Sequence, residues 1–267
     1  MLMSFKFPSA IELKKEEIIA KGKDILNEEA QAIINTAFHL GEDFYQVVEL
    51  ISQCKGKIVV TGIGKSGLVG RKIAATMSSL GIPAIFMSPA EGLHGDLGVI
   101  QKEDIVLGIS KSGESQEILD ILPSIKKIKA KLITMTTKKD STMGRHADIV
   151  LQFRVEKEAC HMGLAPTTST TVCLAIGDAI ALVVSELKGF KPDDFALYHP
   201  GGSLGKRLTL NVEDLLSEDC LSYVPINSTF KEVVIELTRK PLGGTVVLNE
   251  NKQLAGIITD GDLRRTL

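Results

Sequence analysis

The segment TGIGKSG at 61–67 could hold an anion, because its glycines have the spacing G-x-G-x-x-G. A P-loop would need another glycine five positions before Gly64, where the chain has Val59. A dinucleotide site would need an acidic residue at the end of the next strand, but the nearest is Glu91, in the following loop. The segment therefore predicts a turn for a smaller anion, with Lys65 enclosed by the glycines.

The segment SKSGES at 110–115 is the stronger phosphate candidate. Three serine hydroxyls surround a glycine directly before a predicted helix. Free backbone N–H groups and the helix dipole favour an anion there, and the glycine lets the backbone approach it closely. The alternative is a serine that only caps the helix, but the second anion turn at 61–67 favours phosphate. The hydroxyls at 167–171 are open to the same two interpretations.

Residues that could move a proton lie in the same group of loops. A carboxylate partly removed from water can act as a base, and a histidine or lysine can stabilise charge on an oxygen. Glu114 and Glu158 are the carboxylates, although Glu114 could instead favour the dipole of the helix that follows it. His94 lies beside Asp96, either as an oriented acid or base or as half of a loop-stabilising pair. The Cys-His pair at 160–161 is too small a set to indicate a metal site, so no metal is predicted.

Alternating strands and helices must position these loops. Continuous apolar runs imply strands that are buried on both faces, and helix-length amphipathic stretches separate them. The five runs are 57–61, 83–87, 104–109, 131–135 and 148–152. Residues 10–53 have the spacing of an amphipathic helix, and 168–187 is a long apolar helix. The pattern predicts an α/β fold with a doubly wound, five-stranded parallel sheet, whose ligand lies beyond the carboxyl ends of the strands.

The composition is that of an ordinary globular protein, with 44% hydrophobic and 24% charged residues. A net charge of −2 gives no reason to expect a nucleic-acid partner. The first residues lack the apolar core of a signal peptide, and the apolar run 171–184 is short and interrupted by Asp178, so no membrane span is predicted. The four cysteines are scattered and suggest no disulfide framework. We therefore expect a cytoplasmic protein.

The character of the sequence changes near residue 208, which divides the chain into domains at 1–208 and 209–267. The second domain has a β-α-β-β-α pattern, with a hairpin turn at 249–251 between two apolar runs. A small α+β domain is therefore expected after the parallel sheet.

Five segments together resemble the sugar-isomerase (SIS) domain of the arabinose-5-phosphate isomerases. They are GIGKSG, GISKSGES, KEAC, GLAPTTSTT and FALYHPGGSLGKR. The resemblance covers roughly 10–210, and 211–267 is similar to one CBS motif. It implies interconversion of arabinose 5-phosphate and ribulose 5-phosphate through a cis-enediol, without metal or other cofactor, to supply 3-deoxy-octulosonate for lipopolysaccharide or capsule.

The resemblance also implies which residues form the site. The catalytic positions are Lys65, Glu114, Glu158 and His199, with His94 as a further candidate. The positions for the sugar phosphate are Gly64, Ser66, Ser110, Ser112, Gly113, Ser115 and Thr168. We take Glu158 as the expected base and His94 as the alternative, and His199 could reach the site of a neighbouring subunit.

A sugar phosphate and further copies of the chain are the expected partners. The resemblance implies a homo-oligomer that is at least a dimer and, as the preferred form, a tetramer, assembled through the SIS domain. Gly256, Thr259 and Asp262 match a pattern that contacts ribose or phosphate in CBS modules, which implies a nucleotide or nucleotide-sugar effector. The alternative is a hairpin in which the aspartate caps a helix. Relatives carry two CBS motifs and this sequence contains one, so either the second lies outside it or two chains pair.

Two other functions compete with the isomerase. SIS domains also occur in regulators, so a non-catalytic phosphosugar sensor is the first alternative. The carboxylates near the predicted phosphate loops and the lack of an apparent helix-turn-helix segment argue against it. A nucleotide-binding oxidoreductase is disfavoured by the missing acidic residue after the second strand.

Overall fold

A computed structural model describes residues 13–201, 213, 221–240 and 242–266. Contacts divide the chain into one unit at 1–205 and another at 206–267, which are described separately below. The boundary predicted near 208 lies outside the described residues.

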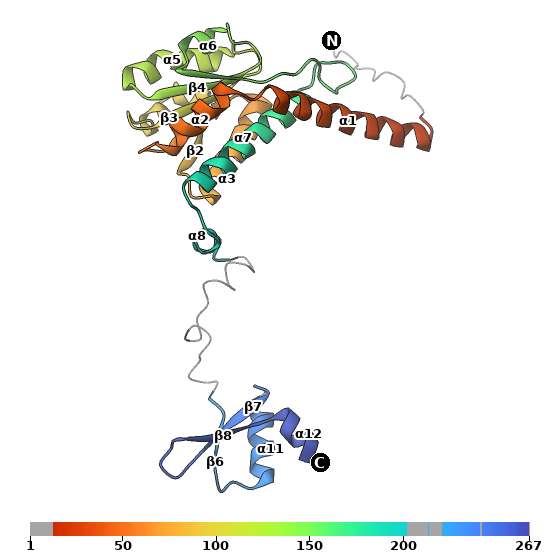
Figure 1. The fold of residues 1–267 in the computed structure, drawn as a ribbon, viewed down its shortest axis with the longest axis vertical. Coiled ribbons are helices and arrows are strands. Elements are labelled where there is room, and N and C mark those ends of the chain that lie inside the picture. The colour runs from red at the N-terminus through yellow and green to blue at the C-terminus, as the bar shows by residue number, and fades with distance from the viewer. Residues whose placement is uncertain (1–12, 202–212, 214–220, 241, 267) are drawn as a thin grey trace, which may run out of the picture. The chain divides into compact units, whose positions relative to one another are not determined.

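The first unit contains a five-stranded parallel sheet, as the sequence predicts (Figure 1). The strands are β1 (Ile58–Gly62), β2 (Ala84–Met87), β3 (Ile105–Ile109), β4 (Lys131–Thr136) and β5 (Ile149–Gln152). Their order in the sheet is β2-β1-β3-β4-β5, so the order reverses between β1 and β3. Every residue of β1 and of β3 is buried, because helices cover both faces of the sheet. In folds of this kind a ligand binds where the strand order reverses.

Two helical layers enclose this sheet (Figure 1). One face packs against α2 (Glu42–Ser52), α3 (Gly64–Ser79) and α7 (Thr168–Leu187) in the larger core cluster. The other face packs against α5 (Gln116–Ile128), with α6 (Thr142–His146) beside it. Short helices α4 (Pro89–Gly92) and η1 (Asp96–Val99) follow β2, and α8 (Pro192–Tyr198) follows α7. The predicted doubly wound α/β fold is confirmed.

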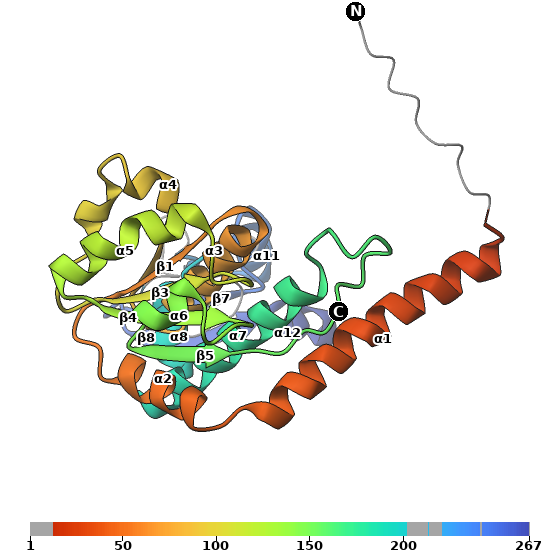
Figure 2. The ribbon, with the colours of Figure 1, turned by 90° about the horizontal axis from the view of Figure 1, so that it is seen from above.

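The helical pattern at 10–53 forms two helices with a break between them. The first, α1 (Lys15–His39), packs against α7, and its amino-terminal half extends beyond the sheet (Figure 2). The break falls at Gly41, whose φ of −148° and ψ of −140° are not helical. Thr36 is the one residue of α1 that is fully buried, so most of this helix is exposed within a single chain. The apolar spacing at 10–53 continues across this break, so the sequence pattern did not predict it.

Helix α7 is the one described helix that is long and apolar enough to cross a membrane, with a mean hydropathy of 1.7 over its best window. At 20 residues α7 is longer than the apolar run 171–184 within it, and a buried core helix passes the same test of length and composition. Its buried side chains, such as Val172, Ile176 and Ile180, belong to the main core cluster. It is therefore a core helix of the sheet domain.

At the amino ends of the strands, Asp104 ties β1 to β3. It is 3% exposed and accepts hydrogen bonds from Lys57 N at 2.9 Å, Lys57 Nζ at 2.6 Å and Gln101 N at 2.8 Å. Burial disfavours its ionised form, but the hydrogen bonds from Lys57 and Gln101 outweigh burial, and the pKa of Asp104 is lowered.

We expect Asp104→Ala to lower the free energy of unfolding by about 2–4 kcal/mol at neutral pH, because three part-buried hydrogen bonds lose their buried acceptor. The folded pKa lies below the unfolded one. The stabilisation is therefore complete above the unfolded value of about 3.9 and is lost as pH falls through the folded value. Urea unfolding at several pH values checks this, and the difference from wild type should shrink below about pH 4. Asp148→Ala is the control, since Asp148 also bonds a lysine, Lys131, but is 36% exposed. A loss no larger than that of the control would contradict this role.

The second unit is a small α+β domain, as predicted. It contains β6 (Tyr223–Pro225), α11 (Phe230–Arg239), β7 (Gly244–Leu248), β8 (Leu254–Thr259) and α12 (Asp260–Thr266). Strand β6 is parallel to β7, and β7 and β8 form an antiparallel hairpin. Asn249 N donates to Gln253 O at 2.9 Å, which closes the turn expected at 249–251.

The motif proposed for an effector contact is internally bonded. Asp262 accepts from Thr259 N at 2.8 Å and from Thr259 Oγ1 at 2.7 Å. These hydrogen bonds, followed by one from Arg265, lower the pKa of Asp262 to about 2. In this structure Thr259 and Asp262 therefore bond each other reciprocally at the start of α12, which is the helix-capping role that the alternative interpretation describes.

Candidate active site

Four loops emerge at the same edge of the sheet. The register pairs Gly62 with Ile109 and Ile109 with Met135, so β1, β3 and β4 end level with one another. Thr136 pairs with Gln152, which brings the end of β5 to the same edge. The segments that follow these strands are 63–67, of which 64–67 form the first turn of α3, and the loops 110–115, 137–141 and 153–167. Parallel topology thus gathers segments that are far apart in sequence.

The glycines of the first loop have different tasks. A Cβ on Gly67 would lie 2.6 Å from Gly62 O, so this glycine lets α3 pack closely on the end of β1. Gly64 has a φ of +58° and nothing within 4 Å of a Cβ position, so it is needed for its backbone conformation. Lys65 is exposed in the first turn of α3 and has no hydrogen bond or ion pair with the described residues. The loop therefore presents a free ammonium group at the edge where a ligand is expected.

The loop 110–115 packs closely against Ser141, and no side chain caps the amino end of α5 that follows it. Gly113 has a φ of +67°, and a Cβ there would lie 2.0 Å from Ser141 Oγ. The hydroxyls of Ser110 and Ser115 are 2.9 Å apart, and Gly113 N donates to Ser110 Oγ at 3.0 Å. Ser115 is the N-cap residue of α5, but its side chain makes no capping hydrogen bond. The structure thus favours the anion interpretation of these serines over a plain serine cap.

Glu158 is buried within the fourth loop and is 6% exposed. Its Oε1 accepts from Lys111 Nζ at 2.6 Å and from Ser169 Oγ at 2.5 Å. Its Oε2 accepts from Thr167 N at 2.9 Å, Ser169 N at 3.1 Å and Thr167 Oγ1 at 3.4 Å. Both oxygens are therefore saturated, and the carboxylate caps the amino end of α7.

This environment sets the charge of Glu158. Burial raises its pKa, but the hydrogen bonds from Lys111, Ser169 and Thr167 together outweigh burial and lower the pKa to about 2. The side chain is thus ionised at neutral pH. Sequence reasoning missed Lys111 and Ser169 as its partners. The one available signal was a lysine between two serines in a loop at the edge of the sheet.

The remaining predicted residues at this edge are less closely connected. Glu114 is exposed and accepts from Thr142 N at 2.7 Å; this hydrogen bond is the first cause of its lowered pKa. Glu114 therefore binds the first backbone N–H of α6. This is a structural role at a helix start, as considered from the sequence, but at α6 and not at the helix that directly follows Glu114. Thr168 is buried, and its Oγ1 accepts from Ala159 N at 2.9 Å, so it shapes the 153–167 loop. His94 is exposed between α4 and η1, and no hydrogen bond joins it to Asp96.

His199 lies at the opposite edge of the same chain. It directly follows α8, and its ring stacks on Phe195 with centroids 3.8 Å apart. Phe190 and Tyr198 lie against Gly81, which precedes β2 and so marks the amino ends of the strands. Helix α7 has 20 residues, about 30 Å at 1.5 Å per residue, and it separates α8 from the 153–167 loop (Figure 1). A site that uses both Glu158 and His199 must therefore take them from different chains.

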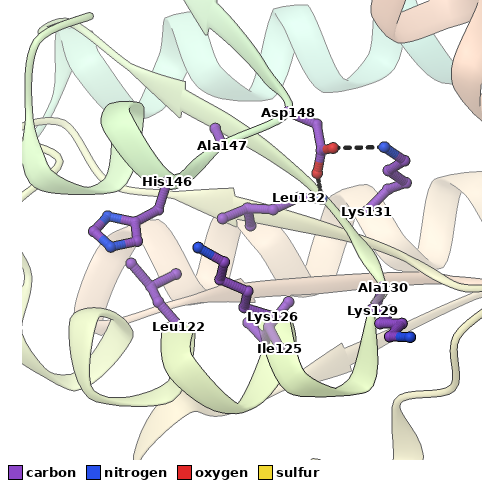
Figure 3. A pocket seen from close by; sticks show the side chains of 10 residues that line it. All are labelled: Leu122, Ile125, Lys126, Lys129, Ala130, Lys131, Leu132, His146, Ala147 and Asp148. Carbon is purple, nitrogen blue, oxygen red and sulfur yellow. Dashed lines mark hydrogen bonds and ion pairs between the residues drawn. The ribbon is translucent and has the colours of Figure 1, made fainter.

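An open depression of about 570 Å³ lies at the carboxyl ends of β4 and β5. Its lining residues are Glu114, Lys138, Lys139, Asp140, Ser141 and Gln152. Another cavity, of about 330 Å³, lies at the opposite edge between α5, β4 and α6 (Figure 3). There Lys131 Nζ binds Asp148 Oδ1 at 2.7 Å, and Lys126 extends between His146 and Leu132. The second cavity contains none of the predicted site residues, and Glu114 is the one that lines the first, so the candidate site is defined by the strand-end segments around Glu158 and borders the first depression at Glu114.

Comparison with known proteins identifies both parts of the chain. The SIS domain family matches residues 50–183, and the CBS domain family matches 212–267. The arabinose 5-phosphate isomerase KdsD of Yersinia pestis is 47% identical over 245 residues, covering 91% of this chain and 75% of that protein. The KdsD of Pseudomonas aeruginosa is 48% identical over 240 residues, covering 90% and 74%.

A solved structure extends the similarity to a bound ligand. The structure of c3406 from Escherichia coli CFT073 in complex with arabinose 5-phosphate is 41% identical, with a TM-score of 0.69. The match covers 70% of this chain and 100% of that one. The likeness therefore includes the whole of a protein that was solved with a sugar phosphate bound.

Proposed function

The chain belongs to the arabinose 5-phosphate isomerase family, and we propose that the loops at the carboxyl edge of its sheet divide the reaction into phosphate binding and proton transfer. The enzyme interconverts D-arabinose 5-phosphate and D-ribulose 5-phosphate. Through its family it supplies 3-deoxy-octulosonate for lipopolysaccharide or capsule. The observation that carries the assignment of the site is the buried, ionised Glu158, which is bonded to a lysine of the serine-rich loop.

The sugar phosphate binds through loops 63–67 and 110–115. The uncapped amino ends of α3 and α5 offer backbone N–H groups, and the serines add hydroxyl donors. Gly64 and Gly113 hold these turns in left-handed conformations. The sugar carbons then extend toward Glu158, which lies across the same edge.

Ser112→Ala should raise KM about tenfold to a hundredfold, because losing a hydrogen bond to a charged group costs roughly 1.5–3 kcal/mol. Stability should change little, since Ser112 is exposed and its hydroxyl accepts only from Glu114 N, at 3.2 Å. Steady-state kinetics with arabinose 5-phosphate measure the effect. Ser52→Ala is the control, because Ser52 is a half-buried serine at the end of α2, away from this edge. An unchanged KM for Ser112→Ala would exclude this residue from the phosphate site.

The reaction moves one proton from C2 to C1 and another from the oxygen on C2 to the oxygen on C1. Glu158 takes the proton from C2 of the aldose and returns it to C1, so that the cis-enediol becomes the ketose. Lys65 and His199 stabilise charge on the oxygens of the enediol. His94 is the alternative base, and neither assignment involves a metal or a nicotinamide.

The active form is a homo-oligomer, at least a dimer and preferably a tetramer, joined through the SIS domain. Apolar side chains on α1 are exposed in the single chain, including Leu26 at 69% and Phe38 at 84%. Helix α7 adds exposed Leu182 and Leu187. A neighbouring chain would cover these surfaces and bring its His199 to Glu158.

The proposal also includes a nucleotide or nucleotide-sugar effector at the CBS domain and a cytoplasmic location.

One assay separates this function from its alternatives. The protein is incubated with ribulose 5-phosphate, without any added cofactor, and arabinose 5-phosphate is measured. We expect it to form. A non-catalytic phosphosugar sensor would bind the compound and leave it unchanged, and a nucleotide-dependent oxidoreductase would need its cofactor. Identity of 44% or more to curated isomerases over most of the chain favours the enzyme over the sensor.

A further inference from the structure

Lys111 joins the two halves of the proposed site. It is the second residue of the 110–115 loop, and its Nζ lies 2.6 Å from Glu158 Oε1. Its backbone oxygen accepts from Thr137 N at 3.0 Å and from the hydroxyls of Thr136 and Thr137 at 3.1 and 2.8 Å, which fixes the base of the side chain. The side chain of Lys111 is 43% exposed, whereas that of Glu158 is 3% exposed. The ammonium group therefore touches a buried carboxylate and also borders the open edge of the sheet.

The two oxygens of Glu158 are held in different ways. Oε2 accepts from the backbone N–H groups of Thr167 and Ser169, which are fixed in the first turn of α7. Oε1 accepts from two side chains, those of Lys111 and Ser169. While the carboxylate keeps its position, a change of side-chain rotamer at Lys111 can open Oε1, whereas the backbone donors keep Oε2 bonded to the start of α7. Oε1 is thus the oxygen that can become a base while the carboxylate stays in place.

Glu158 is a weak base in the empty site. A general base works best when its pKa is near the working pH, and here the pKa is about 2. Lys111 is the cationic group that faces it. From α7, Cys173 has a pKa raised to about 12, by burial first and by the charge of Glu158 second, so its thiol stays neutral. The neighbouring Lys157 binds Glu28 at 2.8 Å. A movement of Lys111 would therefore change the basicity of Glu158 more than any other charge nearby.

We propose that Lys111 is a positioning residue. Its ammonium group binds Oε1 of Glu158 while the site is empty, and it moves to bind the phosphate when the sugar phosphate is present. The proposal rests on the proposed function, which puts that phosphate in the loop containing Lys111. A phosphate carries more negative charge than a carboxylate, so it competes well for the ammonium group. Burial, no longer opposed by the ion pair, then makes Glu158 more basic.

The proton balance is complete with the residues present. In the aldose-to-ketose direction, Oε1 takes the proton from C2, and its new O–H bond replaces the C–H bond that breaks. The electron pair released at C2 forms the C1–C2 double bond, and the carbonyl oxygen on C1 takes a proton from the group proposed to stabilise it, Lys65 or His199, which gives the enediol. C1 then takes the proton back from Oε1, and the hydroxyl on C2 returns a proton to the same group as it becomes the ketose carbonyl. The carboxylate is restored, and no oxidant, reductant or other reactant is consumed.

Two variants of Lys111 test the proposal through the pH dependence of kcat/KM, which reports groups of the free enzyme. In Lys111→Met the acid limb should move up by about one pH unit or more, because Glu158 loses its cation. KM should rise about tenfold, and kcat should stay within about threefold of wild type. Lys111→Arg should keep the wild-type acid limb and KM. Lys126→Met, which removes a lysine at the opposite edge, is the control and should change neither.

Inorganic phosphate provides a measurement that needs no turnover. Calorimetric binding of phosphate should weaken about tenfold in Lys111→Met and remain unchanged in Lys126→Met. If the acid limb of Lys111→Met stays in the wild-type position, and its loss of activity matches its loss of thermal stability, Lys111 only stabilises the structure. That result would overturn the proposal. Unchanged phosphate affinity would overturn it as well. If wild type binds phosphate but does not isomerise the sugar, the proposed function fails, and the phosphate titration still decides the role of Lys111.

Discussion

Glu158→Gln should lower kcat by roughly two to four decades, the usual contribution of a positioned acid–base group. Glutamine has nearly the same shape as glutamate, but its amide cannot take the proton from C2. KM for arabinose 5-phosphate should change little, because the phosphate loops are untouched. Steady-state kinetics at saturating substrate measure the loss.

The same substitution affects the end of α7, so stability must be measured beside activity. Glutamine keeps one acceptor oxygen, whereas Glu158 uses both of its oxygens to accept five hydrogen bonds. We expect a lowered melting temperature but a folded protein. Glu156→Gln is the matched control, because Glu156 lies two residues away on the same loop and is exposed. A folded Glu158→Gln enzyme within about tenfold of wild-type kcat would exclude Glu158 as the base.

Mixing two inactive variants should restore activity. Within one chain, His199 lies at the opposite edge of the sheet from Glu158, so the proposed site, which uses both residues, needs two chains. In a mixed dimer of Glu158→Gln and His199→Ala chains, one shared site is intact in both residues and the other is intact in neither. Random pairing of equal amounts should therefore recover about a quarter of wild-type activity. Each variant alone should have about 1% or less, since both lose a group that acts in the transition state.

A second mixture controls for nonspecific rescue. Lys65 and Glu158 lie at the same edge of one chain, so Lys65→Met and Glu158→Gln chains should not complement each other. Light scattering should show at least dimers in both mixtures. If the Glu158→Gln and His199→Ala mixture is no more active than its parts, or if the protein is monomeric, a site shared between chains is wrong.

The fold could be predicted from local patterns because each strand is short, apolar and followed by a helix. The five runs between 57 and 152 became five parallel strands with almost the predicted bounds. Parallel topology then placed the loops at 63–67, 110–115 and 153–167 on one edge, since the ends of parallel strands must coincide. The helix at 168–187 was predicted with the bounds that the structure has.

The contacts of the site could not be predicted, because they depend on side chains that meet across the sheet. Lys111 and Glu158 are 47 residues apart in the chain, and neither has a spacing that points to the other. The break at Gly41 was missed because the apolar spacing of the two helices runs on across it. The position of His199 depends on which end of α7 the chain leaves, and this follows from the topology rather than from the residues around His199.

Hydrogen exchange tests the central claim most directly. Wild type and Glu158→Gln are each incubated with arabinose 5-phosphate in heavy water, and deuterium at C1 of the ribulose 5-phosphate formed and at C2 of the remaining aldose is followed by NMR. Wild type should incorporate deuterium at least in part, because the proton on Glu158 exchanges with solvent before it is returned. In Glu158→Gln, exchange and isomerisation should disappear together. If exchange at C2 persists in Glu158→Gln while isomerisation stops, another residue removes the proton, and His94 becomes the first candidate for the base.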